Sequence, residues 1–176
     1  PDVHDFTGAR RIVDLGGGDG SLLAAVLERA PEAHGVLVER PPALAAAELR
    51  LGPLVDAGRC ELVEGDFLRG VPRGADVYLL SRILHNWSDQ DACTVLCHRR
   101  DAMSPDGRVL SAARVLPDED PPWPSSFLDA HMMVMTTGAE RTEDEYEKLL
   151  RSAGLTTHHI LDLPLEMRLL VAGPCT

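Results

Sequence analysis

A glycine-rich turn between a buried strand and a helix constrains the fold of this chain more than any other feature. Residues 11–15 form a short apolar run, residues 16–20 read Gly-Gly-Gly-Asp-Gly, and residues 21–29 carry an apolar stripe with helical spacing. Glycines allow a sharp turn and a close approach of backbone to ligand, and the N-terminus of the following helix offers unpaired N–H groups. This order of elements predicts the first unit of a parallel α/β sheet.

The same alternation of strand and helix continues along the chain. Further strands are predicted by apolar runs at residues 35–39, 61–63, 75–80 and 108–115. Further helices are predicted at residues 43–51, 88–103, 127–135 and 142–153. Ser88 is placed as a helix cap, Thr142 and Glu145 have capping-box spacing, and Gly154 suits the C′ position. Residues 157–161 and 168–172 are predicted to form an antiparallel pair at an edge of the sheet.

Composition limits the classes of function. The chain has 176 residues, 44% of them hydrophobic, and a net charge of −11 from 28 acids and 17 bases. A nucleic acid or an anionic membrane requires basic surface, so neither is expected as a partner. No apolar run approaches the roughly 20 residues of a membrane-spanning helix. The four cysteines lack the spacing of a zinc site, so no metal and a reduced, cytoplasmic protein are expected.

The residues around the glycine turn favour one nucleotide cofactor over another. A dinucleotide fingerprint requires a third glycine where this chain has Ser21, and Asp19 would place a carboxylate beside a pyrophosphate. The positive sulfonium and ammonium groups of S-adenosylmethionine tolerate such carboxylates better. Glu39 ends the second strand, where it could accept both ribose hydroxyls. Asp66 and Phe67 follow the third strand, where they could contact an adenine amino group and ring face.

Four segments in register resemble a known family. They are residues 14–20, residues 64–67, residues 79–87 (Leu-Leu-Ser-Arg-Ile-Leu-His-Asn-Trp) and residues 138–142 (Gly-Ala-Glu-Arg-Thr). Together they resemble the catalytic domain of plant-type and bacterial antibiotic-pathway O-methyltransferases that use S-adenosylmethionine, over residues 6–174. The resemblance implies a class I methyltransferase fold: a Rossmann-like seven-stranded α/β sheet of order 3-2-1-4-5-7-6, with the last strand antiparallel.

The resemblance also implies domain organisation and partners. Residues 1–176 would be the cofactor-binding catalytic domain. Members of the family carry an additional amino-terminal domain, largely helical with a winged-helix part, that mediates dimerisation and closes over the substrate. The chain begins with Pro1, so we expect it to lack that domain and to form a homodimer when the domain is present. The predicted helix at 127–135 is apolar on more than one face, so one face should meet substrate, the absent domain or a partner subunit.

The resemblance assigns roles to individual residues. His85 matches the general base and Glu140 its orienting acid, since a neutral histidine suits removal of a hydroxyl proton. A histidine packed beside Trp87 is the alternative. The expected contacts of S-adenosylmethionine, or of its product S-adenosylhomocysteine, are Asp14, Gly16, Gly18, Glu39, Arg40, Gly65, Asp66, Phe67, Ser81 and Arg82. Arg82 is better suited to a salt bridge than to chemistry. The expected contacts of a small, aromatic acceptor are Trp87, Asp129, His131, Met132 and Met135.

Two positions depart from the family pattern. Ala113 stands where the family has a glutamate, and Asn86 where it commonly has an aspartate. The expected function is nevertheless O-methylation of a small hydroxyl compound in bacterial secondary metabolism. Three alternatives remain open. The first is a relative that binds the same cofactor but hydroxylates or decarboxylates. The others are a non-catalytic binding protein and an NAD-dependent oxidoreductase.

Overall fold

The computed structural model describes residues 3–117, 138–165 and 167–175. The predicted helix at 127–135 lies outside the described residues. So do four of the expected acceptor contacts, namely Asp129, His131, Met132 and Met135.

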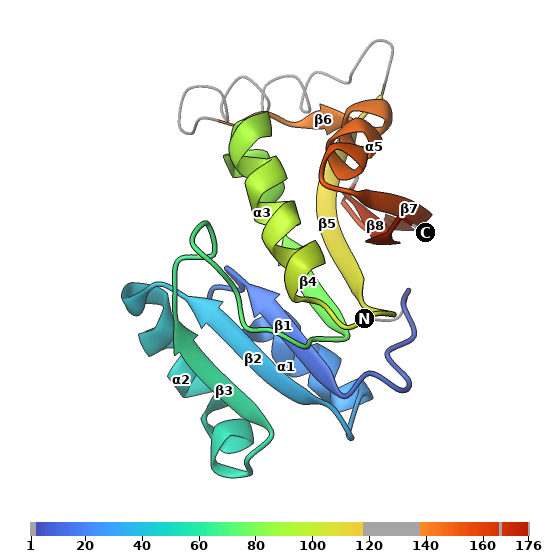
Figure 1. Cartoon of the computed structure of the whole chain (residues 1–176). Helices are drawn as coiled ribbons and strands as arrows, with labels where there is room; N and C mark the ends of the chain where they lie inside the picture. The colour runs from blue at the N-terminus through green and yellow to red at the C-terminus, as the bar shows by residue number, and fades with distance from the viewer. Residues whose placement is uncertain (1–2, 118–137, 166, 176) are drawn as a thin grey trace.

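The described strands form one twisted sheet in the order β3-β2-β1-β4-β5-β8-β7 (Figure 1). The strands are β1 (Arg11–Leu15), β2 (His34–Glu39), β3 (Cys60–Glu64), β4 (Val77–Ser81), β5 (Arg108–Leu116), β7 (Leu155–Leu163) and β8 (Met167–Pro174). The first five run in parallel, and β8 is antiparallel to both β5 and β7. This confirms the predicted order and the single antiparallel strand. A two-residue strand, β6 (Arg141–Thr142), pairs with the end of β5 and was not predicted.

Helices cover the two faces of the sheet (Figure 1). One face carries α1 (Ser21–Arg29) and α2 (Pro41–Asp56), and the other carries α3 (Asp89–Ala102) and α5 (Glu143–Ser152). The prediction for α2 was too short, because Pro41 suits the first helical turn and the helix continues past Pro53. The cap at Ser88, the capping box of Thr142 and Glu145, and Gly154 at φ +73° are confirmed. None of the described helices is long and apolar enough to span a bilayer.

Alternating strand side chains build the core on both faces. In β1, Val13 and Leu15 pack toward α3 and α5, whereas Ile12 packs toward α1 and α2. All three side chains are fully buried. Successive residues of a strand point to opposite faces, so a strand between two helical layers must be apolar throughout.

Asp14 is the exception to the apolar composition of β1. Its side chain has no solvent exposure, and within the described residues neither carboxylate oxygen has a hydrogen-bond partner. A Cβ atom added to Gly17 would lie 2.2 Å from Asp14 Oδ2, so the carboxylate lies directly against the glycine turn. Burial raises the pKa of Asp14 to about 7, and the charge of Glu39 adds to the effect.

The raised pKa makes folding stability depend on pH. An unfolded aspartate ionises near pH 4, so the folded chain loses stability as pH rises from there to about 7, the pKa of buried Asp14. Asp14→Asn cannot ionise and escapes this loss. We expect the free energy of unfolding of Asp14→Asn, relative to the parent chain, to increase by about 2–3 kcal/mol between roughly pH 5 and pH 8.

Urea unfolding at several pH values between these limits measures the difference. Asp56→Asn is the matched control, because Asp56 is exposed at the end of α2. Parallel pH profiles for the parent chain and Asp14→Asn would contradict the raised pKa.

Candidate active site

A cleft of about 370 Å³ opens at the carboxyl ends of β1 and β4. Ligand sites of parallel α/β sheets assemble at this edge. The cleft is lined by residues of the glycine turn, the start of α1 and the segment after β4, namely Gly16, Gly17, Gly18, Asp19, Ser21, Leu22, Ser81, Arg82, His85 and Asn86. The structure therefore brings the expected cofactor contacts Gly16, Gly18, Ser81 and Arg82 into one cleft with His85.

The glycine turn is packed too closely for larger residues. The Gly16 N–H donates to the Val38 carbonyl at 2.9 Å, and Gly16 has φ +67°. A Cβ atom there would lie 2.6 Å from Ile83 Cδ1 and 3.3 Å from a ring carbon of Phe67. Gly17 is limited in the same way by Asp14 and was missed by the sequence analysis. A Cβ atom at Gly18, in contrast, would meet nothing within 4 Å, so the backbone there is open toward the cleft that the turn lines.

Asp19 places a stable negative charge in the cleft. Its Oδ1 accepts from the Ser21 N–H at 3.1 Å and the Ser21 hydroxyl at 2.7 Å, and its Oδ2 accepts from Arg50 Nε at 3.0 Å. The hydrogen bonds from Ser21, aided by Arg50, hold the pKa of Asp19 below its usual value. The start of α1, which would otherwise attract an anion, therefore already carries a carboxylate.

The ends of β2 and β3 adjoin the glycine turn. The Gly65 N–H donates to the Glu39 carbonyl at 3.1 Å, and the Glu39 carboxylate accepts from the Arg40 N–H. Asp66 is exposed and accepts from the Leu68 N–H at 3.0 Å, so its side chain also stabilises its own turn. The side chain of Arg40 is exposed at the start of α2. Glu39, Gly65 and Phe67 thus lie beside the turn, and Arg40 and Asp66 lie further out.

His85 and Glu140 form a buried pair in the wall of the cleft. His85 lies in the short helix η1 (Leu84–Asn86), and its Nδ1 is 2.9 Å from Glu140 Oε1, 55 positions along the chain. Both side chains are less than 10% exposed. Because a carboxylate only accepts hydrogen bonds, this contact requires a proton on Nδ1 and leaves Nε2 of the neutral ring as the basic nitrogen.

A strained residue turns the chain from β4 into η1. Arg82 has φ +58°, a value that a non-glycine residue adopts only at a cost. Its N–H donates to the Ala112 carbonyl at 2.8 Å, and its carbonyl accepts from Asn86 Nδ2 at 3.0 Å. Asn86 therefore stabilises the turn. Within the described ranges no acidic side chain pairs with Arg82, so the salt bridge considered for it is not found there.

A buried arginine supports the aromatic residues beside the cleft. The rings of Phe67 and Trp87 meet edge to face with centroids 6.1 Å apart. The Arg99 guanidinium lies 5.5 Å from the centroid of the Phe67 ring and donates to the Phe67 carbonyl at 3.1 Å. Burial lowers the pKa of Arg99 to about 9. Arg99 was not predicted as a site residue, because nothing in the sequence distinguishes it from Arg100, which is half-buried.

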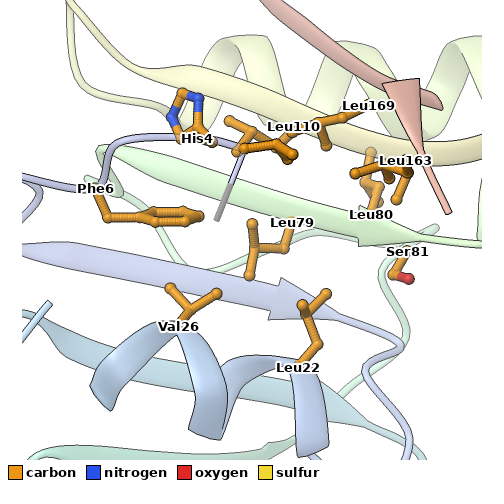
Figure 2. Close-up of a pocket in the computed structure, with 12 residues that line it drawn as sticks. His4, Phe6, Leu22, Val26, Leu79, Leu80, Ser81, Leu110, Leu163 and Leu169 are labelled. Atoms are coloured by element: carbon orange, nitrogen blue, oxygen red, sulfur yellow. The ribbon is translucent and has the colours of Figure 1, made fainter. Parts of the chain in front are cut away.

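A smaller pocket of about 80 Å³ lies on the face of the sheet that carries α1 (Figure 2). Its walls are leucine side chains from α1, β4, β5, β7 and β8, closed by His4 and Phe6 near the start of the chain. Leu22 and Ser81 line both this pocket and the cleft. The hydrocarbon walls are suited to packing, whereas the charged groups lie in the cleft.

Comparisons with known proteins agree on one family. A family model described as an O-methyltransferase domain matches residues 2–156. The chain is 43% identical to a 3-amino-4-hydroxybenzoate 4-O-methyltransferase of Streptomyces cremeus, over 98% of this chain and 47% of the relative. It therefore spans about half the length of that relative.

Solved structures give the same result. The mitomycin 7-O-methyltransferase MmcR has a TM-score of 0.92 and 40% identity, covering 99% of this chain and 51% of that chain. The O-methyltransferase NcsB1 from neocarzinostatin biosynthesis, solved with S-adenosyl-L-homocysteine and 1,4-dihydroxy-2-naphthoic acid, has a TM-score of 0.86 and 29% identity, covering 98% and 51%. With its class I methyltransferase fold and a family model that matches most of its length, the chain belongs to the O-methyltransferase family.

Proposed function

We propose that this chain is the catalytic domain of an enzyme that transfers a methyl group from S-adenosylmethionine to a hydroxyl of a small aromatic compound in bacterial secondary metabolism. The observation that carries the proposal is the buried His85–Glu140 pair, whose histidine lines the same cleft as the glycine turn. The relative from Streptomyces cremeus acts on a hydroxybenzoate, and NcsB1 was solved with a dihydroxynaphthoic acid, which supports an aromatic acceptor.

The charges around the cleft fit a cofactor with a cationic tail. Asp14 is buried without a partner in the described residues, directly against Gly17, and Asp19 is held ionised at the start of α1. Both carboxylates would repel a pyrophosphate and attract a sulfonium or an ammonium group. These observations favour S-adenosylmethionine over NAD.

The residues that would hold the cofactor come from the ends of four strands. Glu39 and Arg40 would lie nearest the ribose, and Asp66 and Phe67 nearest the adenine. The remaining contacts would come from β1 and its glycine turn, from the residue after β3 and from the end of β4, at Asp14, Gly16, Gly18, Gly65, Ser81 and Arg82. When bound, S-adenosylmethionine supplies a methyl group activated by its sulfonium sulfur.

His85 would remove the proton of the acceptor hydroxyl. A phenol has a pKa near 10, so a base at Nε2 assists its attack at neutral pH. Glu140 accepts from Nδ1–H and would stabilise the imidazolium that forms. Asn86 bonds the backbone of its own turn, and Ala113 is buried in the core, so neither replaces the acids of the family pattern. Glu140 would act as the orienting acid, and Trp87 would border the acceptor.

The proposed cofactor contacts can be tested at Glu39. Loss of a charged hydrogen-bonding partner costs about 1.5–3 kcal/mol, so Glu39→Ala should weaken binding of S-adenosylhomocysteine at least about tenfold. Isothermal titration calorimetry measures the affinity, and NAD should bind far more weakly. Glu48→Ala, at an exposed position of α2, is the control and should bind normally. Tight binding of NAD, or an unaffected Glu39→Ala variant, would refute the cofactor assignment.

The proposed role of the base can be tested at His85. In the polypeptide that carries the amino-terminal domain, His85→Ala should reduce turnover by about 10²–10⁴-fold, the usual contribution of a general base. The affinity for S-adenosylhomocysteine should stay nearly unchanged. Turnover is measured as transfer of a labelled methyl group to a panel of phenols that includes 3-amino-4-hydroxybenzoate. His159→Ala, at an exposed position of β7, should retain activity. A loss below about tenfold would mean that positioning of the acceptor dominates and that His85 is a packing residue.

The proposed function also predicts how the protein assembles. We propose that a cytoplasmic homodimer forms through an amino-terminal domain that also completes the acceptor site. The 176 residues alone should then self-associate and turn over slowly, and the polypeptide with that domain should be an active dimer. Analytical ultracentrifugation and methyl-transfer assays compare the two. A monomeric and fully active 176-residue chain would contradict this proposal.

A further inference from the structure

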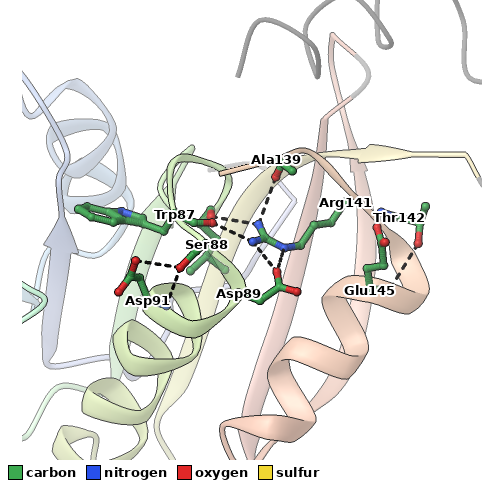
Figure 3. Close-up of polar contacts among 9 residues, drawn as sticks. Trp87, Ser88, Asp89, Asp91, Ala139, Arg141, Thr142 and Glu145 are labelled. Atoms are coloured by element: carbon green, nitrogen blue, oxygen red, sulfur yellow. Dashed lines mark hydrogen bonds and ion pairs between the residues drawn. The ribbon is translucent and has the colours of Figure 1, made fainter. Parts of the chain in front are cut away.

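Arg141 is a buried cation beside the acid of the proposed catalytic pair. Its side chain is 5% exposed, and it follows Glu140 directly in the chain. In Figure 3 the guanidinium lies between the backbone of residues 84–89 and that of residues 139–142. An arginine is costly to bury, so the contacts that compensate for its desolvation indicate what it does.

The guanidinium bonds carbonyls on both sides of His85. Nη1 donates to the Leu84 carbonyl at 3.1 Å, and Nη2 donates to the Trp87 carbonyl at 2.9 Å. Nη1 also donates to the Ala139 carbonyl at 3.2 Å. The Arg141 side chain thus bonds the backbone on both sides of His85 and directly before Glu140. The planar guanidinium holds these groups in a geometry that the point charge of a lysine cannot reproduce.

The ion pair of Arg141 contributes less than these carbonyls. Asp89 Oδ1 accepts from Nε at 2.9 Å and from Nη2 at 2.8 Å. However, the Asp89 side chain is 85% exposed, so solvent screens the pair. The ring of Tyr146 lies below the guanidinium, with its centroid 5.9 Å from Cζ. Asp89 and Tyr146 therefore only flank the guanidinium, and the carbonyls are the groups that it holds.

A second contact attaches the same two segments on the other side of Glu140. A Cβ atom added to Gly138 would lie 2.0 Å from the His85 carbonyl oxygen and 2.5 Å from the Trp87 nitrogen. The backbone at Gly138 therefore packs directly on the turn that carries His85. Beyond Arg141, the strand β6 pairs with β5. Glu140 lies between these attachments, so its distance from His85 is set by its neighbours.

We infer that Arg141 is a positioning residue that holds Glu140 against Nδ1 of His85 and so keeps the proton on Nδ1. This inference rests on the proposed function, because it concerns the base of that reaction. Arg141 touches neither cofactor nor acceptor in this role. It acts by joining the turn that carries the base to the segment that carries the acid, leaving Nε2 free to accept a proton.

The tautomer of His85 tests the inference without any substrate. A free neutral imidazole prefers the proton on Nε2, whereas this site requires it on Nδ1. Solid-state ¹⁵N NMR of histidine-labelled protein distinguishes the two, and it suits the full-length polypeptide at about pH 8.5, where an unperturbed imidazole is neutral. The His85 signals are assigned by their loss in His85→Ala. In Arg141→Lys we expect the share of the Nδ1–H form to fall by about half or more.

Three further variants sharpen the test. Arg151→Lys, on the exposed side of α5, and Asp89→Asn should both keep the parent spectrum. Gly138→Ala should shift the tautomer as Arg141→Lys does, because it separates the same two segments at the second attachment. If circular dichroism shows that Arg141→Lys does not fold, Arg141→Gln, which removes the same guanidinium, takes its place. A folded Arg141→Lys with an unchanged tautomer overturns the inference. A shift in Asp89→Asn as large as that in Arg141→Lys also overturns it, because the ion pair would then be the positioning contact.

Calorimetry with S-adenosylhomocysteine separates this inference from the proposed function. Arg141→Lys should bind S-adenosylhomocysteine within about twofold of the parent affinity, because its contacts are to the base and not to the cofactor turn. A parent protein that binds no S-adenosylhomocysteine would refute the proposed function, and the tautomer measurement would still decide the role of Arg141.

Discussion

The parallel pairing of β1 with β2 on one side and β4 on the other is the constraint on which the site depends. Parallel strands end at the same edge of a sheet, so the segments that follow them converge although they are far apart in the chain. The glycine turn follows β1, Glu39 ends β2, and Ser81 ends β4. Backbone hydrogen bonds in the sheet therefore bring the residues of the cleft together, independently of contacts between the side chains of the cleft.

Two buried arginines attach the loops of this edge to the core. Arg99 bonds the Phe67 carbonyl, and Arg141 bonds the carbonyls of Leu84 and Trp87. Each of these carbonyls lies outside the hydrogen-bond ladders of the sheet, where a buried acceptor needs another partner. A cation bonded to a carbonyl forms a stronger hydrogen bond than a neutral donor would. Arg99 thus connects the loop after β3 to α3, and Arg141 connects the turn that carries the base to β6, directly before α5.

The cleft concentrates negative charge that the isolated chain must tolerate. Asp14, Asp19 and Glu39 surround the glycine turn, and the raised pKa of Asp14 reflects the cost of burying a carboxylate near another. Asp19 is tolerated differently, because Ser21 and Arg50 bond it at the surface. A cationic ligand would offset the cost of the buried Asp14 carboxylate and would be attracted by the Asp19 carboxylate. The buried carboxylate of Asp14 thus lowers folding stability at neutral pH, and the same group favours the proposed cofactor.

The sequence by itself determined the succession of strands and helices along the chain and the helix caps, because apolar periodicity, capping residues and the glycine turn are local patterns. The order of the strands in the sheet and the choice of His85 as the base came from the resemblance of four motifs to a known family. The sequence could not determine that Glu140 lies 2.9 Å from His85, since these two residues stand 55 positions apart in the chain and approach only through sheet pairing. Nor could it separate Arg99 from Arg100, or predict Arg82 at φ +58° and the two-residue strand β6. Each of those features depends on how the folded chain packs and on which buried backbone groups then need a hydrogen-bond partner, so only the tertiary structure decides it.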